Sequence, residues 1–496
     1  MATRTAARTP LELSDITVVE GKSLRKAITA AAVGNGVEWF DFGVYGFVAY
    51  ALGKVFFPHA SPALQTIAAL GTFSVPFLMR PLGGLFFGYI GDRLGRQRVL
   101  AFTIILMSLS TFCIGLIPGY ATIGLWAPAL LLLCKLVQGF SVGGEYIGAS
   151  IFVAEYAPDR RRGFYGSWLD FGSIAGFLLG AGFVVLLQTA MGEAAFLEWG
   201  WRLPFLIAAP LGLIGFYLRH SVDETPSFLQ EQERQAAEGT KAHSTSFRAI
   251  LSECRSSLLV CIGMVIVTNI SYYMLLTYMP TYLSGSLGYS EGHGVLIIIL
   301  VMIGMLAVQP LIGWGSDRIG RKPFLFAGSI GLLLLSIPAY YMVGSGDTHR
   351  IFTGLLLLAL MLSCLIGTMA STLPALFPTR IRYSALACSF NLAVIVAGLT
   401  PTIVAWMVET TQNLMMPAYY LMLTGVVGLI TAFNIPETAC RPLRGDAPKA
   451  SSDDEAMQLL HENFRSIEHR ILAIDLEIER LTERRQDLVL RHPDLD

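Results

Sequence analysis

The sequence predicts an all-α polytopic membrane protein with about twelve transmembrane helices in two six-helix halves, followed by a C-terminal coiled-coil helix. The first observation is composition: 54% of the 496 residues are hydrophobic and only 14% are charged, whereas soluble domains carry about 25% charged residues. The second is a series of apolar runs of about 20 residues, the length that crosses a bilayer as a helix. The third is a glycine-rich polar motif that occurs once in each half.

The apolar runs divide the chain into domains. The expected spans of the first half are approximately 27–55, 64–90, 99–119, 123–153, 163–189 and 202–218. Those of the second half are approximately 256–284, 292–314, 323–343, 350–374, 384–408 and 417–435. The expected domains are an N-terminal segment 1–26, an N-terminal bundle 27–218, a linker 219–255, a C-terminal bundle 256–435 and a tail 436–496. No cleavable signal peptide is expected, because the chain is polar up to about Lys26 and the first apolar run is long enough to span.

The repeated motif reads G-x-x-x-D-R-x-G-R and follows the second expected helix of each half. Glycines let two helix ends approach closely, and an aspartate can pair with arginines or with a helix N-terminus. We expect both copies to gate the carrier by latching one conformation, without contacting substrate; a plain positively charged anchor is the alternative. The expected gating residues are Gly88, Asp92, Arg93, Gly95 and Arg96, then Gly313, Asp317, Arg318, Gly320 and Arg321.

Arginines gather in the loops that follow the even-numbered helices. Residues 160–162 are three consecutive arginines, and Arg380 and Arg382 follow the tenth expected span. Loops of the other parity carry few Lys or Arg residues. Because positively charged loops remain in the cytoplasm, we expect both termini to be cytoplasmic.

Charged side chains inside the expected spans are the first functional candidates, since they are costly in a bilayer. Glu38 and Asp41 lie one turn apart on the first expected helix. A buried carboxyl group can exchange a proton near neutral pH, as a proton-coupled carrier requires. We expect Glu38, and next Asp41, to couple transport to protons; interhelical hydrogen bonding is the alternative.

Aromatic residues beside Glu38 suggest a substrate class. Their ring faces can hold an ammonium group, while Lys135 or Arg80 receives a carboxylate, so a zwitterion such as a betaine or proline fits. Alternatively the rings face lipid or neighbouring helices, and Arg80 neutralises Glu38 or Asp41. The expected substrate-binding residues are Asn35, Trp39, Tyr45, Arg80, Lys135, Gln138, Asn269, Tyr272 and Tyr273. Asp170 is expected to pair with the arginines of 160–162.

The tail shows a heptad pattern over about 454–490. Its expected coiled-coil residues are Phe464, Ile467, Ile471, Ile474, Ile478, Leu481, Arg485 and Leu488. Arg485 interrupts the apolar seam, and an antiparallel pairing places it near Asp475 or Glu479 of a second copy. We therefore expect an antiparallel homodimer, with a helix that docks on the carrier's cytoplasmic face as the alternative.

Two six-span halves with one shared motif resemble the major facilitator superfamily over roughly residues 25–436. The segments Asn35-Gly-Val-Glu-Trp-Phe-Asp41, Arg80-Pro-Leu-Gly-Gly and Gln138-Gly-Phe-Ser-Val-Gly-Gly-Glu145 look like the metabolite:proton symporter branch. Together with the tail, nearly the whole chain is similar to the bacterial osmosensory proline/betaine transporters. The resemblance implies proton symport of proline, glycine betaine and related osmolytes by alternating access, activation at high osmolality, and a location in the inner membrane. It also implies that Asn35 and Glu38 serve coupling.

Other classes of function have less support. The net charge of −1 offers no argument for nucleic-acid binding. The sequence has no P-loop, no histidines at metal-ligand spacing and no nucleophile elbow, so we expect neither an enzyme nor a cofactor. The expected partners are a small zwitterionic substrate, protons, membrane lipid and a second copy of the chain. A proton symporter of a dicarboxylate or another organic acid without osmosensing, an efflux antiporter and a transport-inactive sensor are the alternatives.

Overall fold

The computed structural model describes residues 12–94, 96–220, 254–289 and 291–464, and also residues 471, 478, 481 and 482. The chain divides into two compact units. One unit is Lys22–Asp446, which holds the helical bundle, and the other combines Met1–Gly21 with Ala447–Asp496.

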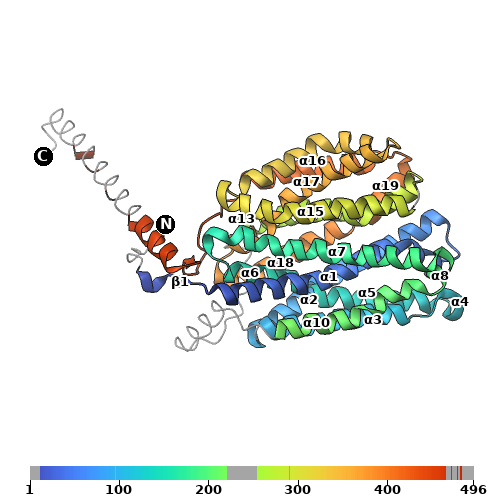
Figure 1. Cartoon of the computed structure of the whole chain (residues 1–496), viewed down its shortest axis with the longest axis horizontal. Helices are drawn as coiled ribbons and strands as arrows, with labels where there is room; N and C mark the ends of the chain where they lie inside the picture. The colour runs from blue at the N-terminus through green and yellow to red at the C-terminus, as the bar shows by residue number, and fades with distance from the viewer. Residues whose placement is uncertain are drawn as a thin grey trace, which may run out of the picture. The chain divides into compact units, whose positions relative to one another are not determined.

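The first half of the bundle consists of helices joined by short connections (Figure 1). In order they are α1 (Gly21–Phe56), α2 (Pro62–Leu94), α3 (Arg96–Leu116), α4 (Tyr120–Ile123), α5 (Trp126–Val142), α6 (Glu145–Tyr156), η2 (Asp159–Arg161), α7 (Arg162–Met191), α8 (Glu193–Glu198), η3 (Gly200–Arg202), α9 (Leu203–Leu206) and α10 (Ala208–His220).

The second half repeats this plan and contains two π-helical segments, η4 and η5. In order its elements are α13 (Arg255–Tyr272), η4 (Tyr273–Tyr278), α14 (Met279–Thr281), η5 (Tyr282–Ser286), α15 (Glu291–Ile319), α16 (Lys322–Val343), α17 (Thr348–Thr372), η6 (Pro374–Leu376), η7 (Thr379–Ile381), α18 (Arg382–Gly398), α19 (Thr400–Thr411) and α20 (Met416–Asn434).

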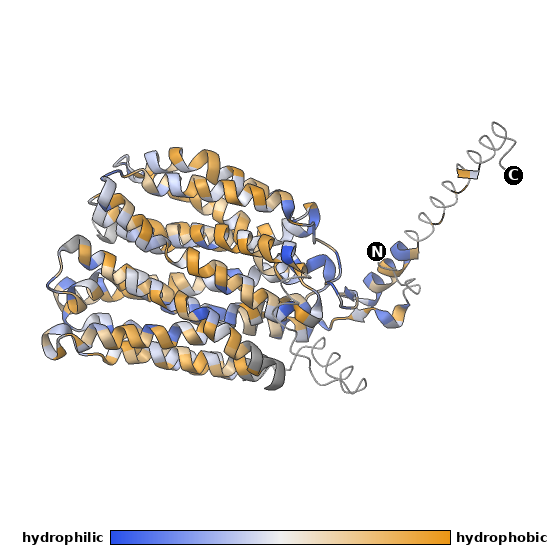
Figure 2. Cartoon of the chain, turned by 180° about the vertical axis from the view of Figure 1, so that it is seen from behind, coloured by the Kyte–Doolittle hydropathy of each residue, from blue (hydrophilic) through white to orange (hydrophobic). Residues whose placement is uncertain are grey.

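Within the described residues, ten helical segments are long and apolar enough to cross a membrane. The other two expected spans correspond to α1, which carries Glu38 and Asp41, and to the shorter apolar run Ala101–Leu116 in α3. Large apolar side chains such as Leu213 and Leu334 are exposed on the bundle surface, and Figure 2 shows hydrophobic residues along the length of its helices. A bilayer would cover such a surface.

The two halves meet along several helix pairs. In Figure 1 the helices from α1 to α10 form one group, and α13, α15, α16 and α17 belong to the other. Helices α7 and α15 run side by side where the groups meet, and α2 packs against α18 elsewhere in the interface. The side chains on these four helices are therefore positioned to connect the halves.

A glycine ridge on α7 lets this helix approach α1 at backbone distance. A Cβ added at Gly180 would lie 2.5 Å from the carbonyl oxygen of Phe40 and 2.9 Å from the backbone nitrogen of Val44. Gly172 and Gly176 face α1 in the same way, against Ala32 and Gly36. These glycines, spaced as Gly172-x3-Gly176-x3-Gly180, place the polar residues of α7 directly beside those of α1.

A break within the fourth expected span also shapes the interior. The span 123–153 forms two helices, α5 and α6, which are separated at Gly143 and Gly144. A side chain at Gly143 would lie 2.6 Å from the backbone nitrogen of Gly84 on α2. Glycine therefore permits the close packing of α2 against α5 that brings Arg80 and Lys135 near α1.

The terminal segments form the second unit. After the short helix η1 (Leu13–Asp15), strand β1 (Thr17–Val18) pairs in parallel with β2 (Lys449–Ala450). Residues 453–464 are helical. Ile16, Ala450 and Ala456 form a small apolar core, against which Leu459 and Leu460 pack.

Candidate functional site

Two buried ion pairs connect α1 to its neighbours. Glu38 Oε1 lies 3.6 Å from Arg80 Nη2 on α2, and Asp41 Oδ2 lies 3.9 Å from Lys135 Nζ on α5. All four side chains are at most 4% exposed. The sequence left open which acid Arg80 neutralises, and in the structure that acid is Glu38.

The pair on α5 is enclosed by further contacts. Lys135 Nζ donates to Gln138 Oε1 at 2.8 Å and lies 3.9 Å from the centre of the Tyr45 ring. Gln138 Nε2 in turn donates to Asp41 and to Thr111 Oγ1. The ammonium group of Lys135 is thus already bound by protein groups, and receiving a substrate carboxylate would require these contacts to rearrange.

Arg80 is less fully bound. Its guanidinium group lies over the rings of Phe77 and Phe42, with distances of 4.8 and 5.4 Å to the ring centres. Its Nε and Nη2 atoms are buried and find no hydrogen-bond acceptor within the described part of the chain. Buried donors normally have a partner, so this guanidinium group is suited to receive an anionic group of a ligand.

Aromatic residues of both halves meet beside Glu38. The rings of Trp39 on α1 and Tyr272 on α13 have centres 4.5 Å apart, and Tyr273 lies 6.4 Å from Trp39. Trp39 Nε1 and both tyrosine hydroxyls are buried and have no hydrogen-bond partner among the residues described. These side chains pack within the bundle, as their burial shows.

Three of the expected substrate-binding residues form hydrogen bonds within the protein. Asn35 Nδ2 donates to Leu169 O at 2.9 Å and Ser173 Oγ at 2.5 Å on α7. Tyr45 Oη donates to Ala69 O at 3.3 Å. Asn269 Nδ2 donates to Val265 O, one turn earlier in its own helix.

Asp170 departs from the sequence-based expectation. It does not pair with the arginines of 160–162 but accepts a hydrogen bond of 3.0 Å from Tyr146 Oη on α6. Two turns of α7 separate Asp170 from Arg162, whose guanidinium group instead bonds to Asp159. The expectation was wrong because spacing along one helix does not show which neighbouring helix faces the carboxyl group.

The second copy of the repeated motif connects the halves. Asp317 on α15 accepts hydrogen bonds from the backbone N–H groups of Gly163 (2.7 Å) and Phe164 (2.8 Å) at the start of α7. The first N–H groups of a helix lack partners within that helix and attract negative charge. A Cβ at Gly313 would lie 2.6 Å from Gly163 O, so the glycine permits this approach.

Arg321, the last residue of the motif, forms a second cluster with the segment after α20. Arg321 Nη1 donates to Ser371 O at 2.8 Å and Thr438 Oγ1 at 2.7 Å, and burial lowers the pKa of Arg321 to about 10. Partial burial raises the pKa of Glu437, but bonds from the N–H groups of Arg321, Lys322, Thr438 and Ala439 outweigh that effect and lower it overall. The side chains of Asp92, Arg93 and Arg96, and residue Gly95, lie outside the described residues.

A third connection between the halves was missed by the sequence analysis. Arg382 Nη1 on α18 lies 2.9 Å from Glu155 Oε1 on α6 and 3.4 Å from Asp446 Oδ2. Arg162 Nη1 donates to Arg441 O at 2.8 Å. The signal in the sequence is a P-x-R-x-R repeat, Pro158–Arg162 and Pro378–Arg382, after the fourth helix of each half.

Paired six-helix halves with buried ion pairs between their helices define a polytopic secondary transporter. Residues 27–445 match the family described as "Sugar (and other) transporter", and residues 451–496 match "Osmosensory transporter coiled coil". The chain belongs to the sugar (and other) transporter family of the major facilitator superfamily and, within it, to the group of bacterial proline/betaine transporters.

Relatives cover nearly the whole chain. The proline/betaine transporters of Salmonella typhimurium and Escherichia coli are each 63% identical over 491 residues, which is 98% of this chain and 98% of theirs. A glycine betaine/proline/ectoine/pipecolic acid transporter of Dickeya dadantii is 63% identical over 488 residues, 98% of this chain and 97% of that one. Among solved structures, the proton:xylose symporter XylE has a TM-score of 0.70 at 20% identity, covering 88% of this chain and 99% of that one. That likeness shows the fold alone.

Proposed function

We propose that this protein takes up zwitterionic osmolytes such as proline and glycine betaine together with protons, by alternating access. The observation that carries the proposal is the buried Glu38–Arg80 pair, with its unsatisfied guanidinium donors, beside the Trp39–Tyr272 ring pair. A zwitterion has one group for each part of this site. The names of the relatives that are 63% identical support the substrate class.

The same geometry supplies a coupling step. A proton on Glu38 removes its attraction for Arg80 and frees the guanidinium group to bind the substrate's carboxylate. The ring faces of Trp39 and Tyr272 attract the ammonium group. When the proton leaves, Glu38 competes again for Arg80 and displaces the carboxylate. Asp41 is the second candidate for the proton, with Lys135 as its partner.

The cytoplasmic latches belong to the same proposal. The contact of Asp317 with the start of α7 and the Arg382–Glu155 pair both join the halves. Opening toward the cytoplasm requires both contacts to break. We place the first copy of the motif, with Asp92 as its acid, in the corresponding role.

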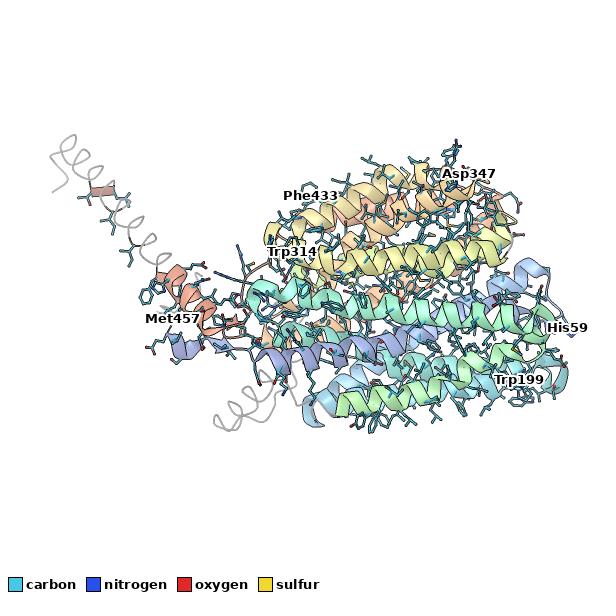
Figure 3. All side chains as sticks on the ribbon, viewed as in Figure 1. His59, Trp199, Trp314, Asp347, Phe433 and Met457 are labelled. Atoms are coloured by element: carbon cyan, nitrogen blue, oxygen red, sulfur yellow. The ribbon has the colours of Figure 1, made fainter. Side chains whose placement is uncertain are left out.

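We also place both termini in the cytoplasm and the bundle in the inner membrane. The arginine-rich connections around Arg162 and Arg382 support this orientation. Figure 3 shows His59, Trp199 and Asp347 together at one end of the bundle, with Trp314 and Phe433 toward the other end. The first three residues belong to connections that are poor in Lys and Arg, which fits a periplasmic end.

The tail is proposed to report osmolality and to form an antiparallel homodimer. Its match to the osmosensory coiled coil supports the first role. Phe464, Ile471 and Ile478 on the expected seam are 50%, 54% and 56% exposed, so their apolar surface is available to a second helix. Ile467, Ile474, Arg485 and Leu488 lie outside the described residues. Efficient disulfide cross-linking of Arg485→Cys to its own copy would contradict the antiparallel arrangement.

Uptake into proteoliposomes tests the proposal. Labelled glycine betaine and proline are supplied with and without an inward proton gradient, at low and at high osmolality. We expect gradient-driven accumulation that increases at high osmolality. Gradient-driven uptake that is equal at low and high osmolality would contradict the sensing role. Accumulation of organic acids in place of both zwitterions would favour the alternative symporter.

A further inference from the structure

Asp170 is a buried carboxyl group that the proposed mechanism does not use. It is 3% exposed, and it accepts a hydrogen bond from the hydroxyl group of Tyr146 through Oδ1. Its Oδ2 atom is buried without a hydrogen-bond partner within the described part of the chain. A buried carboxylate is strongly unfavourable unless a cation or hydrogen bonds compensate its charge.

Asp170 lies in the same buried layer as Glu38. The Asn35 side chain of α1 contacts α7 at Leu169 and Ser173, on either side of Asp170 in the sequence. Tyr146 donates a hydrogen bond to Asp170, and Phe177 of α7 packs against the ring of Tyr272. The close approach of Gly172 and Gly176 to α1 brings α7, which carries Asp170, against the helix that carries Glu38.

The surroundings of Asp170 suit an organic cation. Tyr272 packs its ring against Phe177 of α7 and against Trp39 of α1, with ring centres 6.0 and 4.5 Å apart. A carboxylate beside aromatic ring faces is the chemistry that binds a substituted ammonium group. Arg80, the donor with unsatisfied N–H groups, pairs with Glu38 and contributes a cation from α2, whereas Asp170 contributes a carboxyl group from α7.

We propose that Asp170 binds the ammonium group of the transported zwitterion, while Arg80 binds its carboxylate. This inference rests on the proposed function and adds the residue that selects for positive charge. Asp170 is then a specificity-determining residue. An analogue of the same shape that lacks the positive charge should be rejected because it leaves the carboxylate of Asp170 uncompensated.

Glycine betaine and 3,3-dimethylbutanoate provide the test. The two molecules have the same shape and the same carboxylate, but a carbon atom replaces the charged nitrogen in the second. Competition of each compound against labelled glycine betaine in proteoliposomes gives a selectivity ratio. We expect Asp170→Asn to lower the wild-type ratio by about tenfold or more, because one attraction to a buried charge is lost. Asp170→Ser, a smaller replacement, provides the same measurement if the asparagine variant does not fold.

Tyr146→Phe is the matched control. It removes the hydrogen bond to Asp170 but keeps the carboxyl group, so the ratio should remain close to the wild-type value. An unchanged ratio in both Asp170 variants would overturn the proposal, and so would loss of accumulation with an unchanged ratio, which assigns Asp170 to the proton. If the wild-type protein itself prefers 3,3-dimethylbutanoate, the zwitterion proposal fails as well. If the wild type selects betaine and the variants do the same, only the role of Asp170 fails.

Discussion

At the scale of single residues, the ion pairs of α1 separate two roles that the sequence could not assign. Glu38 pairs with a cation whose remaining donors are unsatisfied, whereas the partner of Asp41 is enclosed by Gln138 and Tyr45. Protonation of the acid, which weakens its ion pair, should therefore have different consequences at the two sites. We therefore expect the Glu38–Arg80 pair to open more readily than the Asp41–Lys135 pair, which is part of a closed network.

Glu38→Gln should abolish accumulation of glycine betaine against its gradient. The amide cannot take up and release a proton, but it still frees Arg80 for the substrate's carboxylate. Counterflow exchange without a proton gradient should therefore persist. Glu193→Gln is the control, because Glu193 forms an exposed ion pair with Lys54 and should leave both activities unchanged. Full accumulation in Glu38→Gln would contradict the assignment.

Glu437 predicts a pH dependence of stability. Backbone N–H bonds lower the pKa of Glu437 in the folded state despite the effect of its partial burial. Its contribution is therefore complete above the ordinary glutamate pKa of about 4.3, and it is lost as the pH falls through the lower folded-state value. In thermal unfolding of detergent-solubilised protein between pH 3 and 7, Glu437→Gln should lose less stability on acidification than the wild type. The exposed Glu409 provides the control Glu409→Gln, which should follow the wild-type curve.

At the scale of elements, backbone contact between α1 and α7 determines where the polar layer lies. The regular glycine spacing of α7 is visible in the sequence, but the helix that it contacts became known only from the packing. The break between α5 and α6 was not expected, because the apolar pattern continues through Gly143 and Gly144. Hydropathy reports burial in lipid or protein alike and does not record a change of helix direction.

Gly180→Ala should separate α1 from α7. The added methyl group lies too close to Phe40 O and Val44 N, and overpacking of this kind costs about 1–3 kcal/mol. We expect a lower melting temperature and reduced uptake. Gly182→Ala on the same helix meets nothing within 4 Å and should be neutral or slightly stabilising. Equal effects of the two variants would mean that helix propensity, not contact with α1, is being measured.

At the scale of the whole bundle, contacts at one end hold the halves together. Asp317 binds the start of α7, and Arg382 binds Glu155 on α6. The segment after α20 contacts one arginine from each half, since Arg162 donates to Arg441 O and Arg382 lies near Asp446. This segment therefore connects to both halves before the chain continues into the tail at Ala447.

Asp317→Asn should shift the carrier toward its cytoplasm-open state. The amide keeps only one oxygen acceptor for the N–H groups of Gly163 and Phe164 and loses the charge attracted to the start of α7. Spin labels near the ends of α7 and α15 beside this latch should report longer distances in the variant. Asp347→Asn is the control, since Asp347 caps α17 at a different, exposed position. Unchanged distances in Asp317→Asn would show that this contact does not latch the halves.

The sequence alone predicted the class of protein, the two halves, the orientation and the charged side chains of α1, α2, α5 and α7. Hydropathy and repeats carry this information because the length of a span and the cost of a charge in lipid act on each helix separately. The pairing of Arg80 with Glu38, the hydrogen bond from Tyr146 to Asp170 and the contact of Asp317 with α7 became known from the packing of the helices. Such choices depend on the rotation and close approach of helices that lie far apart in the chain, and side-chain spacing along one helix does not contain them.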